Sequence, residues 1–320
     1  MKARDLVGIV EAAYAIEREP HDWLANIHDV IAPVIDAGLG TCAYIYDASA
    51  GAPRLLDTVL RDAPLDLETV KAIAAGASAA YVDRSWRSRP AAHASEIPGY
   101  DDEPVVTSVF APAGIADMLV INAYDPSGFG VYFGAFCPRR GKLSEPRRAT
   151  YDRVAAHVAA GFRLRRRVAL SEAVLTPRGQ IVHAEKSAKL STAREALATA
   201  VRAIDRARGK LRHTDPDAAV GRWRTLVTGR WSLVDHFERD GKRYLIARAN
   251  EPQTPSLEAL TPRERQVLAL AAIGHPPKLI AYDLGIASST VRVLIARAAT
   301  KLRTRGMAAT IRKFLALTRT

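Results

Sequence analysis

The chain has 320 residues, of which 48% are hydrophobic, and it carries a formal net charge of +12. This length predicts two or three domains, each with enough apolar residues for a core of its own. No apolar stretch is long enough to cross a bilayer, so we expect no membrane-spanning segment. The first eleven residues mix acids with apolar side chains, and they predict an amphipathic helix rather than a signal peptide.

Cysteine content and charge distribution bear on location and partners. The two cysteines, Cys42 and Cys137, offer no disulfide framework, which favours a reducing cytoplasm and two buried thiols over a redox switch. Residues 1–160 hold 15 basic and 21 acidic side chains, residues 161–255 hold 20 and 10, and residues 256–320 hold 11 and 3. An acidic front and a basic rear are typical of a protein that meets a polyanion only through its rear.

The front half predicts an alternation of helices and strands. Apolar residues recur at helical spacing over residues 5–37, with a break at Pro20 and with Asp22 as the expected cap of the second helix. Further expected elements are strands at 41–47 and 55–60, a helix at 65–80, and strands at 105–111, 118–124 and 131–136. The last two strands are joined by a turn-rich link, which is typical of a hairpin.

A long helix is expected from about Ser144, and it ends in a basic run from Arg163 to Arg167. We interpret that run as a solvated face, with contact to DNA or membrane phosphates as the alternative. The element order over residues 1–168 resembles a GAF-type sensor domain. That resemblance implies a small-molecule ligand on one face of the sheet, or a domain that has lost its ligand and serves for packing. The aromatic residues near Tyr81 and Trp86 could line such a pocket or only cover the edge of the core.

The middle segment, residues 169–250, predicts a smaller domain. A strand–turn–strand opening is followed by a helix over 187–211 and by strands at 231–238 and 243–249, which flank a hairpin turn at Asp240-Gly241. This order resembles a small PAS-like α+β domain. Residues 251–256 hold two prolines among polar neighbours and predict a linker to a last domain at 257–320.

The last sixty residues predict four helices with a helix-turn-helix at the centre. Thr261 and Glu264 have the spacing of a capping box, with Pro262 at the favoured first helical position. The first of these helices is expected to stop at Gly274, and Gly285 permits the tight turn before the recognition helix.

The recognition helix has two distinct faces. Val291, Ile295, Ala298 and Leu302 recur at spacings of four, three and four, and they predict a buried stripe. The opposite face would then carry the residues suited to base edges in a major groove, namely Ser289, Arg292, Val293 and Ala296. Residues better placed for phosphates are Lys278, Thr290, Arg297, Lys301 and Arg303.

This tail resembles the LuxR/FixJ-type DNA-binding domain of bacterial transcription regulators over about residues 257–315. The resemblance implies bases at Arg292, Val293 and Ala296, phosphates at Lys278, Thr290 and Lys301, and dimerisation through a final helix from about Met307. Three positions depart from the family pattern. Pro276 stands where a Ser or Thr cap is usual, Leu294 where a His is usual, and Met307 where an Arg or Gln is usual. Loss of the cap would cost about 1 kcal/mol locally.

The sequence as a whole predicts a multidomain α+β protein, with GAF-like and PAS-like sensor modules followed by an all-α four-helix helix-turn-helix domain. The expected function is sequence-specific transcription regulation in response to a small-molecule or partner signal. The expected partners are double-stranded DNA, a second copy of the chain and an unidentified small molecule, with RNA polymerase as a further candidate and no membrane. The alternative is a signal- or partner-binding protein whose tail no longer reads DNA.

Other chemistries have little support in the sequence. No phosphate loop, nucleophile elbow or set of metal ligands is present, so neither catalytic residues, a metal nor a cofactor is expected. His183 is expected to be a surface or packed histidine rather than a ligand. A phospho-receiver domain does not fit the element order of the front half.

Overall fold

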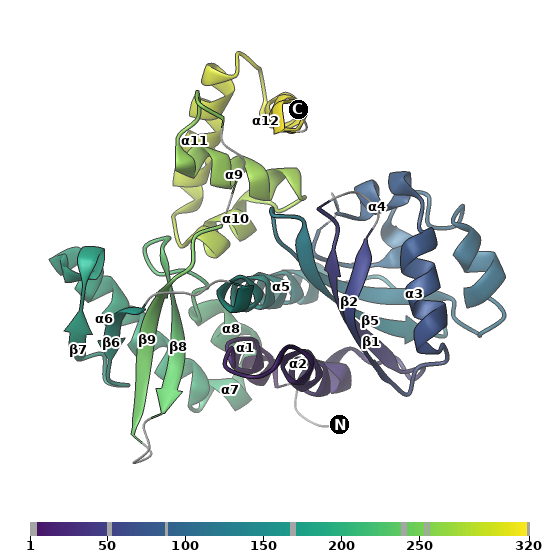
Figure 1. Ribbon diagram of the computed structural model, residues 1–320, viewed down its shortest axis with the longest axis horizontal. Helices are drawn as coiled ribbons and strands as arrows, with labels where there is room; N and C mark the ends of the chain where they lie inside the picture. Colours follow the sequence, from purple (N-terminus) through teal and green to yellow (C-terminus); the bar gives the residue numbers. More distant parts are fainter. Residues whose placement is uncertain are drawn as a thin grey trace.

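The computed structural model describes residues 5–49, 53–86, 89–166, 171–237, 242–252, 254 and 257–318. Two antiparallel sheets stand on either side of a central group of helices (Figure 1). A bundle of short helices formed by residues 257–318 lies above this central group. The chain therefore places an α/β region first and a helical domain last.

The front sheet has five strands in the order β2-β1-β5-β4-β3. Their bounds are β1 Thr41–Asp47, β2 Arg54–Arg61, β3 Ala91–His93, β4 Asp117–Tyr124 and β5 Phe129–Cys137. The strands expected at 41–47, 55–60, 118–124 and 131–136 are confirmed. Neighbouring side chains on a strand point to opposite faces, so Ala43 enters one core while Cys42 enters another. Both cysteines are free and buried.

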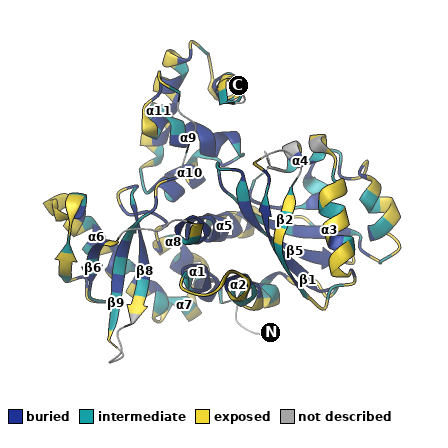
Figure 2. Ribbon diagram, viewed as in Figure 1, coloured by how far each residue is buried: buried dark blue, intermediate teal, exposed yellow. Residues whose placement is uncertain are grey.

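Helices cover both faces of this sheet. α1 (Leu6–Ala13), α2 (Pro20–Ile35) and α5 (Glu145–Arg166) share the larger core with the inner face. α3 (Leu67–Gly76), α4 (Ala79–Trp86), a 3₁₀ turn at Ala94–Glu96 and a π-helix at Val106–Phe110 lie at the outer face. Figure 2 shows α1 and α5 as the buried centre of the molecule, between the two sheets.

The strand expected at 105–111 is wrong, because most of this segment forms the π-helix. Three valines in a short apolar stretch favour a strand by composition. The local polar groups favour a helical turn instead, since the carbonyl of Pro104 accepts hydrogen bonds from the hydroxyls of Thr107 (3.2 Å) and Ser108 (2.8 Å). Tertiary packing then places Phe110 in the outer core.

One smaller expectation also differs from the structure, and one short strand was not predicted. The N-cap of α2 is Glu19, which makes no side-chain cap bond, and Asp22 lies inside the first turn. Pro20 explains the shift, because its fixed φ suits the first helical position. The strand β3 has only three residues and pairs with β4 at the sheet edge, so it left no periodic pattern to detect.

The second sheet belongs to the middle segment and has the order β7-β6-β9-β8. Its strands are β6 Ser171–Leu175, β7 Ile181–Ala184, β8 Trp231–Phe237 and β9 Arg243–Ala249. Its helices are a 3₁₀ turn at Lys186–Lys189, α6 Ser191–Arg208, α7 Leu211–Thr214 and α8 Pro216–Arg222. The hairpin turn expected at Asp240-Gly241 lies outside the described residues.

The two sheets share one hydrophobic core, which extends from Leu6 to Ala247. α1 and α5 link the halves, because α8 packs against both. Tyr14 of α1 stacks on Trp223 just after α8, with ring centroids 6.4 Å apart and an interplanar angle of 3°. A shared core of this kind couples the front sheet mechanically to the middle domain.

The crossing of α1 and α5 depends on Gly161. A Cβ at this position would lie 2.2 Å from the carbonyl oxygen of Ala13, a backbone atom that cannot move aside cheaply. We expect Gly161→Ala to lower the free energy of unfolding by about 1–3 kcal/mol, measured by urea denaturation. Gly76→Ala is the matched control, because Gly76 is also helical, as the last residue of α3, but has nothing within 4 Å of the added Cβ. Equal stability of the two variants would contradict the crossing geometry.

Buried histidines predict acid sensitivity. Burial lowers the pKa of His28 to about 4 and that of His157 to about 3, and burial together with Arg163 lowers the pKa of His275 to about 3. The unfolded chain therefore binds more protons below the ordinary histidine pKa of about 6.5, so stability is lost as pH falls through that value.

Two carboxyl groups act in the opposite direction. Burial raises the pKa of Asp152 and of Asp283 to about 6. Their protonation favours the folded state as pH falls through about 6 and so opposes the effect of the histidines. Because there are three buried histidines and two such carboxyl groups, the net change between about pH 6.5 and pH 5 is a loss of stability. We expect a lower melting temperature at about pH 5 than at about pH 7, and a smaller difference for His275→Gln. A melting temperature that rises on acidification would overturn this assignment.

Candidate nucleic-acid interface

The four helices of the tail are α9 (Pro262–Ala272), α10 (Pro277–Leu284), α11 (Ser288–Lys301) and α12 (Met307–Thr318). The capping box at the start of α9 is confirmed. The amide of Glu264 donates to Oγ1 of Thr261 (3.2 Å), and the amide of Thr261 donates to Oε2 of Glu264 (2.8 Å). The backbone amides of Thr261 and Glu264, which have no partner within the helix, are thus satisfied, and α9 begins at Pro262.

α10, a short turn and α11 form the helix-turn-helix. Gly285 ends α10 with φ 63° and ψ 33°, the left-handed conformation that glycine adopts without a steric cost. The axis bends by 106° between the two helices, an angle typical of this motif. Within the described residues no single helix has the length and hydropathy of a membrane span, although α10 and α11 taken together reach them.

The buried stripe predicted for α11 is confirmed. Its members are 0–9% exposed and pack against α9 and α10: Val291, Ile295, Ala298 and Leu302. The side chains predicted to read bases lie on the opposite face and are all exposed: Ser289, Arg292, Val293 and Ala296. Val293 on this face is 47% exposed.

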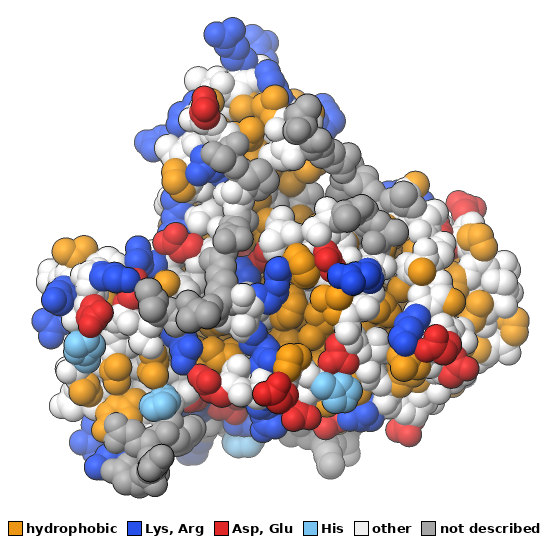
Figure 3. All heavy atoms as spheres, in the orientation of Figure 1, with side chains coloured by type: hydrophobic (Ala, Val, Ile, Leu, Met, Phe, Trp, Pro, Cys, Tyr) orange, Lys and Arg blue, Asp and Glu red, His pale blue; other side chains and the backbone are white. Residues whose placement is uncertain are grey.

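The residues predicted to contact phosphates are exposed as well: Lys278, Thr290, Arg297, Lys301 and Arg303. Lys301 differs from the others because its Nζ lies 2.7 Å from Oε2 of Glu264. Burial raises the pKa of Glu264, but hydrogen bonds from Lys301 and Thr261 outweigh burial and hold that pKa below its usual range. Lys and Arg side chains stand out around this domain on the face shown in Figure 3.

The three unusual positions have distinct surroundings. Pro276 occupies the N-cap of α10 and makes no side-chain cap bond, as its side chain requires. Leu294 is partly buried and packs against the core of the tail, so an apolar residue is compatible with its place. Met307 begins α12 and is 43% exposed. Leu317 near the end of α12 is similarly exposed, at 44%.

The sequence did not predict that the tail is docked on the rest of the chain. The hydroxyl of Tyr282 in α10 donates to the carbonyl of Trp223 (2.5 Å) and lies 2.6 Å from Nε2 of His157 in α5. Leu226 of the middle segment is fully buried within the core of the tail. The added Cβ of any other residue at Gly285 would lie 2.3 Å from the carbonyl oxygen of Leu226. These contacts cover the side of the tail formed by α10 and the turn.

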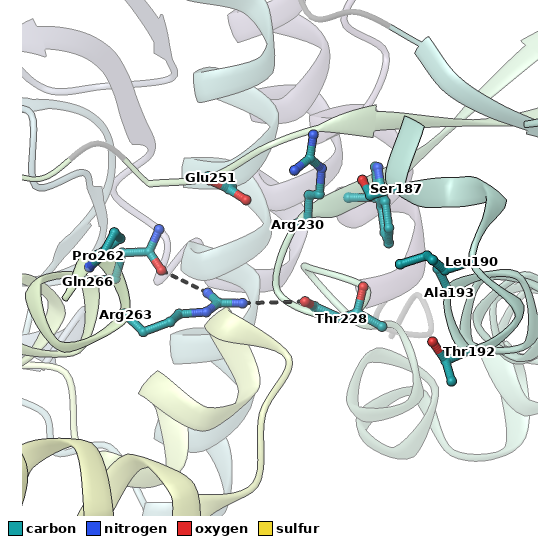
Figure 4. Close-up of a pocket in the computed structure, with 11 residues that line it drawn as sticks. Ser187, Leu190, Thr192, Ala193, Thr228, Arg230, Glu251, Pro262, Arg263 and Gln266 are labelled. Carbon is teal, nitrogen blue, oxygen red and sulfur yellow. Dashed lines mark hydrogen bonds between the residues drawn. The ribbon is translucent and has the colours of Figure 1, made fainter. Parts of the chain in front are cut away.

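A second contact joins α9 to the same segment. Arg263 donates to the side chain of Gln266 (2.8 Å) and reaches the carbonyl of Thr228 (3.3 Å), as Figure 4 shows. A cleft of about 410 Å³ lies here, and its wall also includes Arg230 and Glu251. A hydrogen bond to Glu172 raises the pKa of Arg230, with a smaller contribution from the charge of Glu251. Burial lowers the pKa of Arg263, and the charge of Glu251 only opposes that effect.

A buried polar cluster lies where the front sheet, α5 and the tail meet. Arg163 is 5% exposed, and it donates to Oδ2 of Asp125 in the β4–β5 turn (2.5 Å) and to Oδ1 of Asn250 (3.0 Å). Our interpretation of Arg163 as part of a solvated face is therefore wrong. Nearby in the tail, His275 and Asp283 are buried, with Nδ1 and Oδ2 3.8 Å apart. Arg166, one turn further along α5, is exposed as expected.

The remaining candidates have ordinary surroundings. His183 is exposed on β7 and pairs with Glu185 at 3.2 Å. In the part of the chain that the structure describes, no three His, Cys, Asp or Glu side chains gather as metal ligands. Tyr81 lines a cavity at the outer face of the front sheet, whereas the side chain of Trp86 lies outside the described residues.

Geometry and burial together define the tail as a helix-turn-helix domain with an exposed recognition face. Residues 258–314 match the family model of the bacterial regulatory proteins of the luxR family. The tail is thus a luxR-family helix-turn-helix domain.

Two curated proteins are similar to this chain over about a quarter of its length. Nodulation protein W of Bradyrhizobium diazoefficiens is 37% identical over 81 residues, which are 25% of this chain and 36% of that protein. Transcriptional regulatory protein FixJ of Rhizobium meliloti is 33% identical over 88 residues, 26% of this chain and 43% of that protein. The chain thus matches less than half the length of either relative.

Proposed function

We propose that this protein is a sequence-specific DNA-binding transcription regulator. The observation that carries the proposal is the exposed face of α11, where Arg292 stands beside small apolar side chains on a helix whose other face is buried. Ser289, Arg292, Val293 and Ala296 would read base edges. Lys278, Thr290, Arg297 and Lys301 would position the domain on phosphates, with Lys301 exchanging Glu264 for a phosphate. No enzymatic role is proposed.

The central test is Arg292→Ala. Its guanidinium is exposed and would grip a guanine or a neighbouring phosphate, so we expect a loss of about 1–3 kcal/mol in specific binding. Genomic DNA selection with the full chain would identify the operator, and titration of that operator would measure the loss. Arg194→Ala, an equally exposed arginine on α6, is the matched control. Wild-type affinity in Arg292→Ala would remove this residue from the reading face.

The alternative function is binding of a signal or partner by a protein whose tail no longer reads DNA. The uncapped start of α10 and the pairing of Lys301 with Glu264 favour it. Salt separates the two functions, because each phosphate contact releases counterions and the affinity of a DNA binder falls steeply with salt. Equal, motif-free recovery of genomic DNA by the wild type and Arg292→Ala would support the alternative.

The regions before the tail would supply the signal. We propose residues 1–168 as a GAF-like sensor, residues 169–250 as a PAS-like domain and residues 251–256 as a linker. Support comes from the five-stranded antiparallel sheet with helices on both faces and from the cavity at its outer face.

We also propose that α12, with Met307 and Leu317 exposed, pairs two copies of the chain on half-sites about one DNA turn apart. Light scattering of the free and DNA-bound protein measures that pairing.

A further inference from the structure

The outer face of the front sheet encloses a cavity of about 450 Å³, a volume within the range of ligand sites. The strands β1, β4 and β5 supply one wall, and α3, α4 and the π-helix supply the other. Aromatic side chains occupy both walls, namely Tyr44, Tyr46, Tyr81, Tyr100, Phe110 and Tyr132. Tyr44 and Tyr132 stand as parallel rings with centroids 4.5 Å apart.

The cavity is partly open to solvent, and Tyr44 and Tyr132 on its sheet wall are half-buried. Burial raises the pKa of both phenols well above the ordinary value, so they stay neutral at physiological pH. A space with aromatic walls favours a flat ring, because ring faces and edges attract one another beyond simple burial.

One wall carries a hydrogen-bond donor that no described residue accepts from. The hydroxyl of Tyr46 donates to Oδ1 of Asn122 (2.6 Å), which leaves the amide nitrogen of Asn122 outside that bond. Asn122 lines the cavity and is half-buried, and within the described part of the chain its amide nitrogen makes no hydrogen bond. An acceptor oxygen on a ligand would satisfy this donor.

The charged groups of the lining are already engaged. Both carboxylate oxygens of Glu103 accept hydrogen bonds from Ser78, one from its hydroxyl (2.6 Å) and one from its amide (3.3 Å). Arg89 at the lining pairs with Glu145 at 2.6 Å. An anionic ligand would find Arg89 already paired, and a cationic ligand would have to compete with the hydrogen bonds that Ser78 gives Glu103, so burying either charge in this apolar space is costly.

We propose that this cavity binds an uncharged, planar aromatic compound whose acceptor oxygen is held by Asn122. The proposal deepens the sensing role given to residues 1–168 and rests on it. It is tested without DNA, so failure here leaves the DNA-binding proposal standing, and loss of DNA binding leaves this site untouched.

The ligand class is tested with one ring carrying different substituents. The probes are 2-acetylnaphthalene, which is neutral with a carbonyl, 2-ethylnaphthalene, 2-naphthoate and 2-naphthylmethylammonium, each titrated calorimetrically into the full chain. We expect 2-acetylnaphthalene to bind one molecule per chain and at least about tenfold more tightly than either charged probe. Tighter binding of the carboxylate or the ammonium probe would overturn the proposed class, and absence of saturable 2-acetylnaphthalene binding would overturn the site.

The location is tested by filling the cavity. Val120→Trp places an indole inside it, and Val182→Trp makes the same change at an exposed position of β7. Val120→Trp should abolish 2-acetylnaphthalene binding, and Val182→Trp should leave it unchanged. If Val120→Trp does not fold, Val109→Trp on the π-helix wall takes its place. Asn122→Leu should weaken 2-acetylnaphthalene about five- to tenfold and leave 2-ethylnaphthalene unchanged, because one hydrogen bond is lost. Unchanged binding of 2-acetylnaphthalene in Val120→Trp, or in Val109→Trp where that variant takes its place, would place the ligand elsewhere.

Discussion

Replacing Arg163 by methionine should lower the free energy of unfolding by about 3–5 kcal/mol. The guanidinium is buried between the front sheet, α5 and the tail, where it donates to Asp125 and Asn250. Asp125 is itself 2% exposed, so the variant leaves a carboxylate buried without its partner. Burial raises the pKa of that carboxyl, and the neighbouring Arg163 more than offsets burial and holds it below the usual range. Without Arg163 only the hydrogen bonds from Ser127 oppose the effect of burial.

The measurement is urea denaturation of the full chain at neutral pH. Arg147→Met is the matched control, because Arg147 lies on the same helix, is exposed, and should change stability by no more than about 0.5 kcal/mol. The double variant Arg163→Met with Asp125→Leu should recover much of the loss, since replacing both members of a buried pair by apolar groups is often neutral. A loss below about 1 kcal/mol in the single variant would show that the pair is not desolvated as the structure indicates.

Arg163 also illustrates where sequence patterns mislead. A run of arginines at the end of a helix indicates a solvated face on average, since arginine is rarely buried unless it is paired. The partner here, Asp125, is 38 residues away in a hairpin turn, and no local pattern connects the two. The strand expected at 105–111 failed for a related reason: composition favoured β structure, and tertiary contacts selected a π-helix.

Features that depend on neighbours within a few residues were predictable. The capping box at Thr261, the left-handed turn at Gly285 and the buried stripe of α11 follow from spacing alone. The pairing of Lys301 with Glu264, 37 residues apart, required the fold. The exposed face of α11 is where the sequence placed it, and its role in reading bases remains a prediction.

No sequence pattern predicts that the tail docks on the rest of the chain, because neither the tail nor the segment around Leu226 shows an unpaired apolar stripe in its sequence. Leu226 follows Trp223 in an irregular segment of the middle domain and has no periodicity of its own. The hydroxyl of Tyr282 in α10 bonds to His157 of α5 and to the carbonyl of Trp223 after α8, which are 125 and 59 residues away in the chain. The same helix α5 covers the inner face of the sheet whose outer face bears the cavity. The front sheet and the tail are thus joined through the packing of α5 against β4, β5 and α10.

Replacing Leu226 by alanine should loosen that docking and lower the free energy of unfolding by about 2–5 kcal/mol. Its side chain is 0% exposed and packs with Val267, Ile280 and Leu284 of the tail, so truncation leaves a cavity between two regions of the chain. Leu190→Ala, at a site 61% exposed in the middle domain, is the matched control.

Chemical denaturation measures the total loss, and hydrogen exchange shows where it occurs. Amides of α10 and α11 should lose protection in Leu226→Ala, while those of β1 and β5 keep theirs, because the front sheet makes no contact with Leu226 in this core. Uniform loss across the chain would mean that the tail and the front sheet unfold as one unit. Unchanged protection of α10 would mean that Leu226 does not hold the tail in place and that other contacts, such as that of Tyr282 with His157, suffice.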